Sequence, residues 1–166
     1  RRRPVMLRVL LEYGQMFSNF DVNQRGCSEL PTGHTPLMAA CFSGSFACVQ
    51  LLLEHGANPN MWCGVDGATP LSLAIKSGHK PIVSLLLDWC MTDPNYYSTD
   101  SRWAMPPICE AIHAHQHDIV DLILAHADVS DHSVSGNGIA VPLIVALEAD
   151  NTHAVQALLG RDDLGG

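Results

Sequence analysis

The stretch GHTPLMAACFSGSFACVQLLLEHGANPN, residues Gly33–Asn60, is followed by a looser copy of itself, GATPLSLAIKSGHKPIVSLLLDWC, residues Gly67–Cys90. The proline of each copy serves as a reference point for the rest of the chain. Equivalent prolines follow at intervals of 34, 37 and 35 residues, which places the four at Pro36, Pro70, Pro107 and Pro142. The chain therefore contains four units of similar length.

Each unit carries two sets of apolar positions with helical spacing. The first set lies one, four and five residues after the proline: Leu37, Ala40 and Cys41; Leu71, Ala74 and Ile75; Ile108, Ala111 and Ile112; Leu143, Ala146 and Leu147. The second set lies thirteen, sixteen and seventeen residues after it: Val49, Leu52 and Leu53; Val83, Leu86 and Leu87; Val120, Ile123 and Leu124; Val155, Leu158 and Leu159. Each unit is predicted to form a short helix, opened by its proline, and then a second helix.

The first helix of each unit is too short to be stable alone, so it must bury its apolar stripe against neighbouring units. The alanine four residues after each proline indicates a close approach, where a larger side chain would overpack. A tight turn between the two helices is predicted at residue types that tolerate a left-handed backbone: Gly44, Gly78, His115 and Asp150. Leu52 and Leu86 are expected to lie buried between units.

The period and the motifs together resemble the ankyrin repeat, which has a period of about 33 residues and the signature T-P-L-H-x-A. The resemblance is specific in residues 33–37, 67–71 and 51–58. It implies an all-α solenoid of stacked helix-turn-helix units joined by β-hairpin-like finger loops. Residues 6–14 resemble the second helix of an earlier unit. We therefore expect a single domain over residues 1–166, cut from a longer protein, with a half repeat at 4–23 and repeats at approximately 33–60, 67–95, 104–130 and 139–163.

The sequence departs from the ankyrin signature at two positions. Met38, Ser72, Cys109 and Ile144 stand where the family usually has the histidine, and Pro106 and Val141 replace its threonine. The later units therefore lose the usual Thr–His hydrogen bonding, and we expect apolar packing to replace it.

Composition narrows the class of partner and the cellular setting. A hydrophobic content of 47% predicts a folded core, and the net charge of −8 would repel a nucleic-acid backbone. No apolar run is long enough for a membrane-spanning helix.

The six cysteines include no CxxC pair and no zinc-ligand spacing. Their number alone would allow a disulfide framework, but Cys41 and Cys48 fall at apolar positions of the helices. We expect reduced thiols and a cytoplasmic protein, with the nucleus as a second option.

The resemblance implies that a protein or peptide binds along a concave surface, which the finger loops and the exposed sides of the first helices form. Mapped residue by residue, the partner-binding positions are Tyr13, His34, Phe42, His55, Asp66, Lys76, Trp89, Arg102, Trp103, Met105, His113, His126 and Glu148. Trp89 and Trp103 are the leading anchors, because tryptophan often carries binding energy. The alternative is that each tryptophan covers the helix ends of a neighbouring unit. Residues 93–107 form either a binding finger or a tolerated insertion.

Three clusters contain residue types that are typical of metal or catalytic sites. His113, His115 and His117 lie close to Cys109, but their positions at a helix end and a tight turn should make the rings diverge. Residues 130–133 contain the residue types of a serine triad, but adjacent in a turn, and residues 136–138 lack the lysine of a phosphate loop. We predict no catalytic residue, no metal and no cofactor.

The sequence thus predicts a non-enzymatic protein-binding module with flanking domains in the same protein. Two alternatives stay open: a spacer scaffold that positions those domains, and the substrate-docking part of a larger enzyme whose catalytic domain lies outside this chain. Asn58 is a candidate for hydroxylation, because it follows Leu52, Leu53 and Ala57 as the asparagine does in ankyrin repeats that an asparaginyl hydroxylase modifies. The alternative is that Asn58 serves only its turn.

Overall fold

The computed structural model describes residues 4–5, 7–8, 21–25, 33–64, 67–90, 92–95, 105–126 and 140–160. Pro4, Val5, Leu7 and Arg8 are helical, at the place predicted for the half unit. The helices that follow form four consecutive pairs: α2 (Pro36–Phe42) with α3 (Phe46–Glu54), α4 (Pro70–Lys76) with α5 (Lys80–Asp88), α6 (Pro107–His113) with α7 (His117–His126), and α8 (Ala140–Glu148) with α9 (Thr152–Leu159). We call these pairs unit one to unit four.

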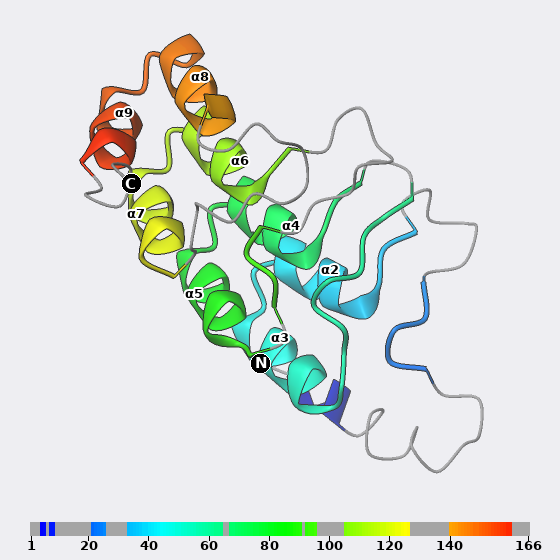
Figure 1. Ribbon diagram of the computed structural model, residues 1–166. Coiled ribbons are helices and arrows are strands. Elements are labelled where there is room, and N and C mark those ends of the chain that lie inside the picture. Colours follow the sequence, from blue (N-terminus) through cyan, green and yellow to red (C-terminus); the bar gives the residue numbers. More distant parts are fainter. Residues whose placement is uncertain are drawn as a thin grey trace.

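The pairs stack side by side in two rows of helices (Figure 1). The first helices, α2, α4, α6 and α8, form one row, and the second helices, α3, α5, α7 and α9, form the other. Each helix contacts its pair partner and the equivalent helix of the next unit. The predicted all-α solenoid of stacked helix-turn-helix units is confirmed.

A finger loop joins unit one to unit two. The amide of Cys63 donates to the carbonyl of Ala68 at 2.8 Å, and the amide of Gly67 donates to the carbonyl of Cys63 at 2.8 Å. These two bonds close a hairpin-like turn, although no residue of the described ranges is assigned to a strand.

The first helices begin as their sequences dictate. In unit two, Thr69 Oγ1 accepts from the amide of Ser72 at 3.1 Å, and Ser72 Oγ accepts from the amide of Thr69 at 2.8 Å. Thr35 and Met38 form the same reciprocal cap in unit one, with the methionine sulfur as an acceptor. Such a box satisfies two amides that the helix leaves open. Threonine therefore keeps its capping role although the family's histidine is absent.

Units three and four begin without a threonine. Pro106 precedes α6 and makes no side-chain cap, and the neighbouring Cys109 is fully buried, so apolar packing replaces the hydrogen bonds there as predicted. Helix α8 begins at Ala140, two residues earlier than the reference proline suggests. Pro142 still falls in the first turn, where its missing N–H leaves no helical bond unmade.

The four predicted tight turns are confirmed. The backbone angle φ is +72° at Gly44 and +70° at Gly78, and it is 53° at His115 and 50° at Asp150. The turn at Gly44 is also crowded, because a Cβ atom added there would lie 2.6 Å from Cε1 of His79 in the next unit. At Gly78 the nearest atom to such a Cβ would be Nε2 of Gln116, at 3.6 Å.

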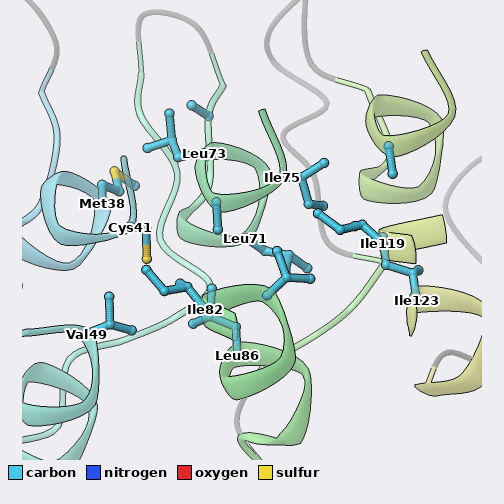
Figure 2. Packing of buried hydrophobic residues seen from close by; sticks show 14 of the residues in the cluster. Met38, Cys41, Val49, Leu71, Leu73, Ile75, Ile82, Leu86, Ile119 and Ile123 are labelled. Atoms are coloured by element: carbon cyan, nitrogen blue, oxygen red, sulfur yellow. The ribbon is translucent and has the colours of Figure 1, made fainter. Parts of the chain in front are cut away.

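The core runs continuously through the stack. Ala74, Ala111 and Ala146 are fully buried at the position of close approach, and Leu52 and Leu86 are buried between units, as predicted. Figure 2 shows how units interlock: Cys41 of α2 points toward Ile82 of α5, and Ile75 of α4 points toward Ile119 of α7. In both cases the fifth residue after one proline meets the twelfth residue after the next.

Unit four differs from the prediction that every apolar stripe is buried. Leu147 and Leu159 are exposed, and so is Ile144, which was expected to pack in place of the family's histidine. The physical reason is that these side chains lie on the far side of the last described pair, where no further pair of the described residues covers them.

Charged pairs link the second helices across units. Lys80 Nζ lies 2.9 Å from Asp118 Oδ2, His126 Nε2 lies 2.9 Å from Asp88 Oδ1, and His153 Nε2 lies 2.9 Å from Asp121 Oδ1. The carbonyl of Leu122 and the carboxylate of Asp88 raise the pKa of His126. Hydrogen bonding to Lys80 lowers the pKa of Asp118. The pairs are exposed to solvent, so each contributes little at neutral pH.

We predict that Gly44→Ala is more destabilising than Gly78→Ala. Both substitutions place alanine in the left-handed region, at a cost of about 1–2 kcal/mol, but only the new Cβ at position 44 collides with His79. Urea unfolding of both variants measures the difference. The excess should vanish when His79→Ala is added to Gly44→Ala; equal effects of the two glycine substitutions would contradict the crowding argument.

The Asp88–His126 pair is predicted to stabilise the fold more at pH 5.5 than at pH 8.5. Because the folded pKa of His126 is raised, its contribution is fully present below the unfolded value of about 6.5 and is lost as pH rises through the folded value. Asp88→Asn should therefore lower the unfolding temperature more at pH 5.5. In a His126→Gln background the same substitution should act equally at both pH values, and a pH-independent effect in the parent chain would refute the assignment.

Candidate interaction surface

The structure describes nine of the thirteen predicted partner-binding residues. Tyr13, Asp66, Arg102 and Trp103 lie outside the described residues, as does most of the long segment 93–107. The nine that are described fall into three groups: the ends of the first helices, the ends of the second helices, and the bases of the fingers.

The first group forms one row across the stack. Phe42, Lys76, His113 and Glu148 are the last residues of α2, α4, α6 and α8, and all four are exposed. They stand together because each lies six residues after its reference proline, just before the tight turn. We call these four residues the helix-end row. It presents an aromatic ring, an ammonium group, an imidazole and a carboxylate in that order.

Lys76 is held by a carboxylate that the sequence analysis missed. Its Nζ lies 2.9 Å from Glu110 Oε1, and the Glu110 side chain is only 5% exposed. Glu110 belongs to the next first helix, at a position where units one and two have Ala39 and Leu73. The presence of one charged residue at a position that is small or apolar in the other units could have indicated this contact. The contact draws the Lys76 ammonium group toward the next first helix.

The second group makes contacts within the chain. Nδ1 of His55 lies 2.8 Å from the carbonyl oxygen of Leu51, and Nδ1 of His126 lies 2.9 Å from that of Leu122. His126 uses its other ring nitrogen for Asp88. Trp89 is half-buried and packs against the core. The two histidine rings therefore contact carbonyls in the last turns of their own helices, and Trp89 packs at the end of α5.

The third group lies where fingers meet helices. His34 and Met105 are half-buried, and Met105 packs against the core.

Arg25 and Trp62 form a contact outside these three groups. The Arg25 guanidinium carbon lies 5.7 Å from the centre of the Trp62 ring, and Arg25 Nη2 donates to the Trp62 carbonyl at 3.0 Å. Neither Arg25 nor Trp62 is among the predicted partner-binding positions. Tryptophan in the finger segment was a signal, but its partner lies 37 residues away.

A ladder of polar turns carries Asn58. The amide of Asn58 donates to Asn23 Oδ1 at 2.7 Å, and Asn58 Oδ1 accepts from the amide of Asn60 at 2.9 Å. Asn60 Oδ1 accepts in turn from the amide of Asp93 at 2.9 Å. Asn58 is exposed although its side chain supports the turn. This ladder ties consecutive units together at the base of the fingers, and the sequence analysis missed it.

The histidines and cysteines of the described residues are the candidates for metal binding and nucleophilic chemistry. No group of three or more His, Cys, Asp or Glu side chains among them is arranged to hold a metal ion. The ring centres of His115 and His117 are 6.5 Å apart. Burial raises the pKa of Cys41 to about 12, and burial together with Glu110 raises the pKa of Cys109 to about 12. Both thiols therefore stay protonated and poorly nucleophilic at neutral pH. None of the described helices combines the length and apolar character needed to cross a bilayer.

Comparison with known proteins places this geometry in a family. Residues 3–98 match the family of ankyrin repeats in the form of three copies. Rabankyrin-5 of Mus musculus is 32% identical over 117 residues, which cover 70% of this chain and 10% of that protein. Human ankyrin repeat and MYND domain-containing protein 1 is 38% identical over 90 residues, covering 49% of this chain and 9% of that protein. The chain thus spans about a tenth of these curated relatives.

The fold is also that of a solved ankyrin structure. The crystal structure of the human ASB11 ankyrin repeat domain is 28% identical, with a TM-score of 0.65, and the match covers 96% of this chain and 69% of that chain. Ankyrin repeats are generally protein–protein interaction modules, and their fold is typically non-catalytic. The match over residues 3–98, the stacked helix pairs and the left-handed turns agree with one another: this chain belongs to the ankyrin-repeat family.

Proposed function

We propose that this chain is a non-enzymatic module that binds a protein or an extended peptide along the surface formed by the finger loops and the helix-end row. The observation that carries the proposal is the row itself. Its members, Phe42, Lys76, His113 and Glu148, are exposed at equivalent positions of four stacked helices. A surface of this kind can contact a partner at regular intervals.

The dimensions of the row suit an extended segment. Packed helices lie about 10 Å apart, so four of them span about 30 Å. An extended peptide of about nine residues has the same length. Because the backbone of the stack is held by burial, the partner would meet a surface that is already ordered, which lowers the entropic cost of binding.

The chemistry of the row favours a partner with an apolar anchor at one end. Phe42 is 62% exposed, and exposed aromatic rings often carry binding energy in protein interfaces. At the other end, Glu148 and the neighbouring Asp150 are exposed carboxylates, which favour a basic group on the partner. The overall charge of −8 disfavours a nucleic acid. An intracellular setting, the cytoplasm or the nucleus, and flanking domains in the same protein belong to the same proposal.

A docking role within a larger protein is favoured by one observation. The chain spans about a tenth of its curated relatives, so the bound partner could be brought to an activity that lies elsewhere in a longer polypeptide. The spacer alternative predicts instead that the isolated chain has no tightly bound ligand.

Hydroxylation of Asn58 is a further proposal. Its exposed side chain is the supporting observation. A mass gain of one oxygen on treatment with an asparaginyl hydroxylase would test the proposal.

Binding is predicted to depend on Phe42 rather than on exposed phenylalanine in general. After a partner has been captured from a cell extract and purified, Phe42→Ala should weaken its binding about tenfold or more by calorimetry. Phe46→Ala is the matched control, because Phe46 is 43% exposed but lies on α3, outside the row. Trp89→Ala and Trp103→Ala complete the series, with unfolding temperatures to confirm intact folds. The proposal fails if no partner is retained or if Phe42→Ala and Phe46→Ala bind equally.

A further inference from the structure

A cation lies on an aromatic ring of the finger that joins unit one to unit two. The Arg25 guanidinium carbon is 5.7 Å from the centre of the Trp62 ring, and Arg25 Nη2 donates to the Trp62 carbonyl at 3.0 Å. Arg25 is exposed, whereas Trp62 is half-buried. The ring therefore supports one face of the guanidinium group while the arginine side chain remains open to solvent.

The backbone that carries Arg25 is tied to the same finger. The amide of Asn23 donates to Asp21 Oδ1 at 2.8 Å, and Asn23 Oδ1 in turn accepts from the amide of Asn58 at 2.7 Å. These bonds hold residues 21–25 beside the finger before any partner arrives. A guanidinium group that is already held in place loses little freedom when it binds a further group.

Arg25 has no ion pair with any of the described residues. Two other described cations, Lys76 and Lys80, each lie 2.9 Å from a carboxylate oxygen. Asp21, the nearest carboxylate along the chain, uses Oδ1 for a backbone amide. Arg8 is the fourth cation in the described part of the chain, and it stacks on no ring there. Within those residues, Arg25 alone combines a supporting ring with the lack of a carboxylate partner.

Gly64 leaves space beside the stacked pair. Its φ lies outside the left-handed region, so the backbone does not require glycine at this exposed position. A Cβ atom added there would lie 3.8 Å from Arg25 Nη1 and 3.9 Å from Trp62 Cζ3, in ordinary contact with both. A longer side chain would extend along the guanidinium group. Its absence keeps Nη1 accessible to another molecule.

A carboxylate is the group that this arrangement recognises. A guanidinium group presents several N–H donors in a planar fork, and a carboxylate can accept two of them at once. Within the described ranges, only the bond to the Trp62 carbonyl uses one of these donors. The net charge of −8 disfavours a strongly acidic partner. The chemistry therefore indicates a single acidic side chain in a neutral or basic segment.

We infer that Arg25, stacked on Trp62, binds an acidic side chain of the partner and thereby fixes the direction in which the partner lies along the stack. The inference rests on the proposed function, because the finger is part of the proposed binding surface. Arg25 provides a positive group beside unit one, and Glu148 and Asp150 provide exposed carboxylates in unit four. A segment with an acidic residue near one end and a basic residue near the other satisfies both ends in one direction only.

Peptides selected on the chain from a phage-displayed random library are the probe. The selected peptides should share an acidic residue, and calorimetry then measures the affinity of one of them. Arg25→Gln should weaken this peptide about tenfold or more. Replacing the acidic residue of the peptide by its amide should weaken binding to the parent chain similarly, and the two changes together should cost no more than either alone.

Lys80→Gln is the matched control for charge. It removes the same positive charge from an exposed side chain, but it does so on α5, in the row of second helices. Affinity for the peptide should therefore stay at the parent value.

Gly64→Leu tests the geometry without a change of charge. The leucine should obstruct Nη1 and weaken the peptide although Arg25 is intact. Because Arg25 and Gly64 are both exposed, Arg25→Gln and Gly64→Leu should leave the unfolding temperature close to that of the parent chain.

The outcomes separate this inference from the proposed function. The inference is overturned if Arg25→Gln binds the peptide as tightly as Lys80→Gln does, if the losses from the two partners simply add, or if Gly64→Leu keeps the parent affinity. The proposed function still stands in those cases when Phe42→Ala weakens the peptide. A chain that retains no peptide, or that binds peptides independently of Phe42, would overturn the proposed function and the inference together.

Discussion

The structure depends on burial between units, because no unit can bury its own apolar stripe. The first helices α2, α4 and α6 have seven residues each, and helices of that length are unstable in water. Their stability comes from neighbours: Ile75 of one unit is buried against Ile119 of the next. Stability in such a stack is a sum of unit terms and interface terms. The exposed side chains of unit four show the same constraint from the other direction. Ile144, Leu147 and Leu159 are exposed, whereas the equivalent positions of units one to three, which have a next layer, are buried or half-buried.

Stacking at this distance dictates the backbone as well as the core. The alanine four residues after each proline permits the close approach, and the left-handed turn lets the second helix return beneath the first. Where glycine is absent, His115 and Asp150 adopt the same backbone conformation. Their strain is sustained because the helices on both sides are fixed by burial. Burial between units therefore holds these two residues in the left-handed conformation.

Periodicity in the sequence was enough to predict the helix pairs, the turns and the buried alanines, because all of these repeat with the unit. What it could not predict involves contacts that do not repeat. Glu110 is a charged residue in an otherwise apolar or small position, and its partner Lys76 belongs to another unit. Arg25 and Trp62 meet across 37 residues. The exposure of Leu147 was missed for a different reason. An apolar residue type indicates that a position is suited to burial, but it does not indicate whether another part of the protein covers that position.

The two rows of helices differ in how far their surface residues can vary without disturbing the contacts between units. At the second helices, His126 and His153 are engaged with carboxylates of the preceding unit, so their replacement alters the coupling between units. At the first helices, the last residue of each projects to solvent just before the turn, and phenylalanine, lysine, histidine and glutamate are all accommodated there. Packing places few demands on that position. The helix-end row can therefore change its chemistry from unit to unit while the stack beneath it stays the same, which is the physical reason for proposing that recognition occurs there.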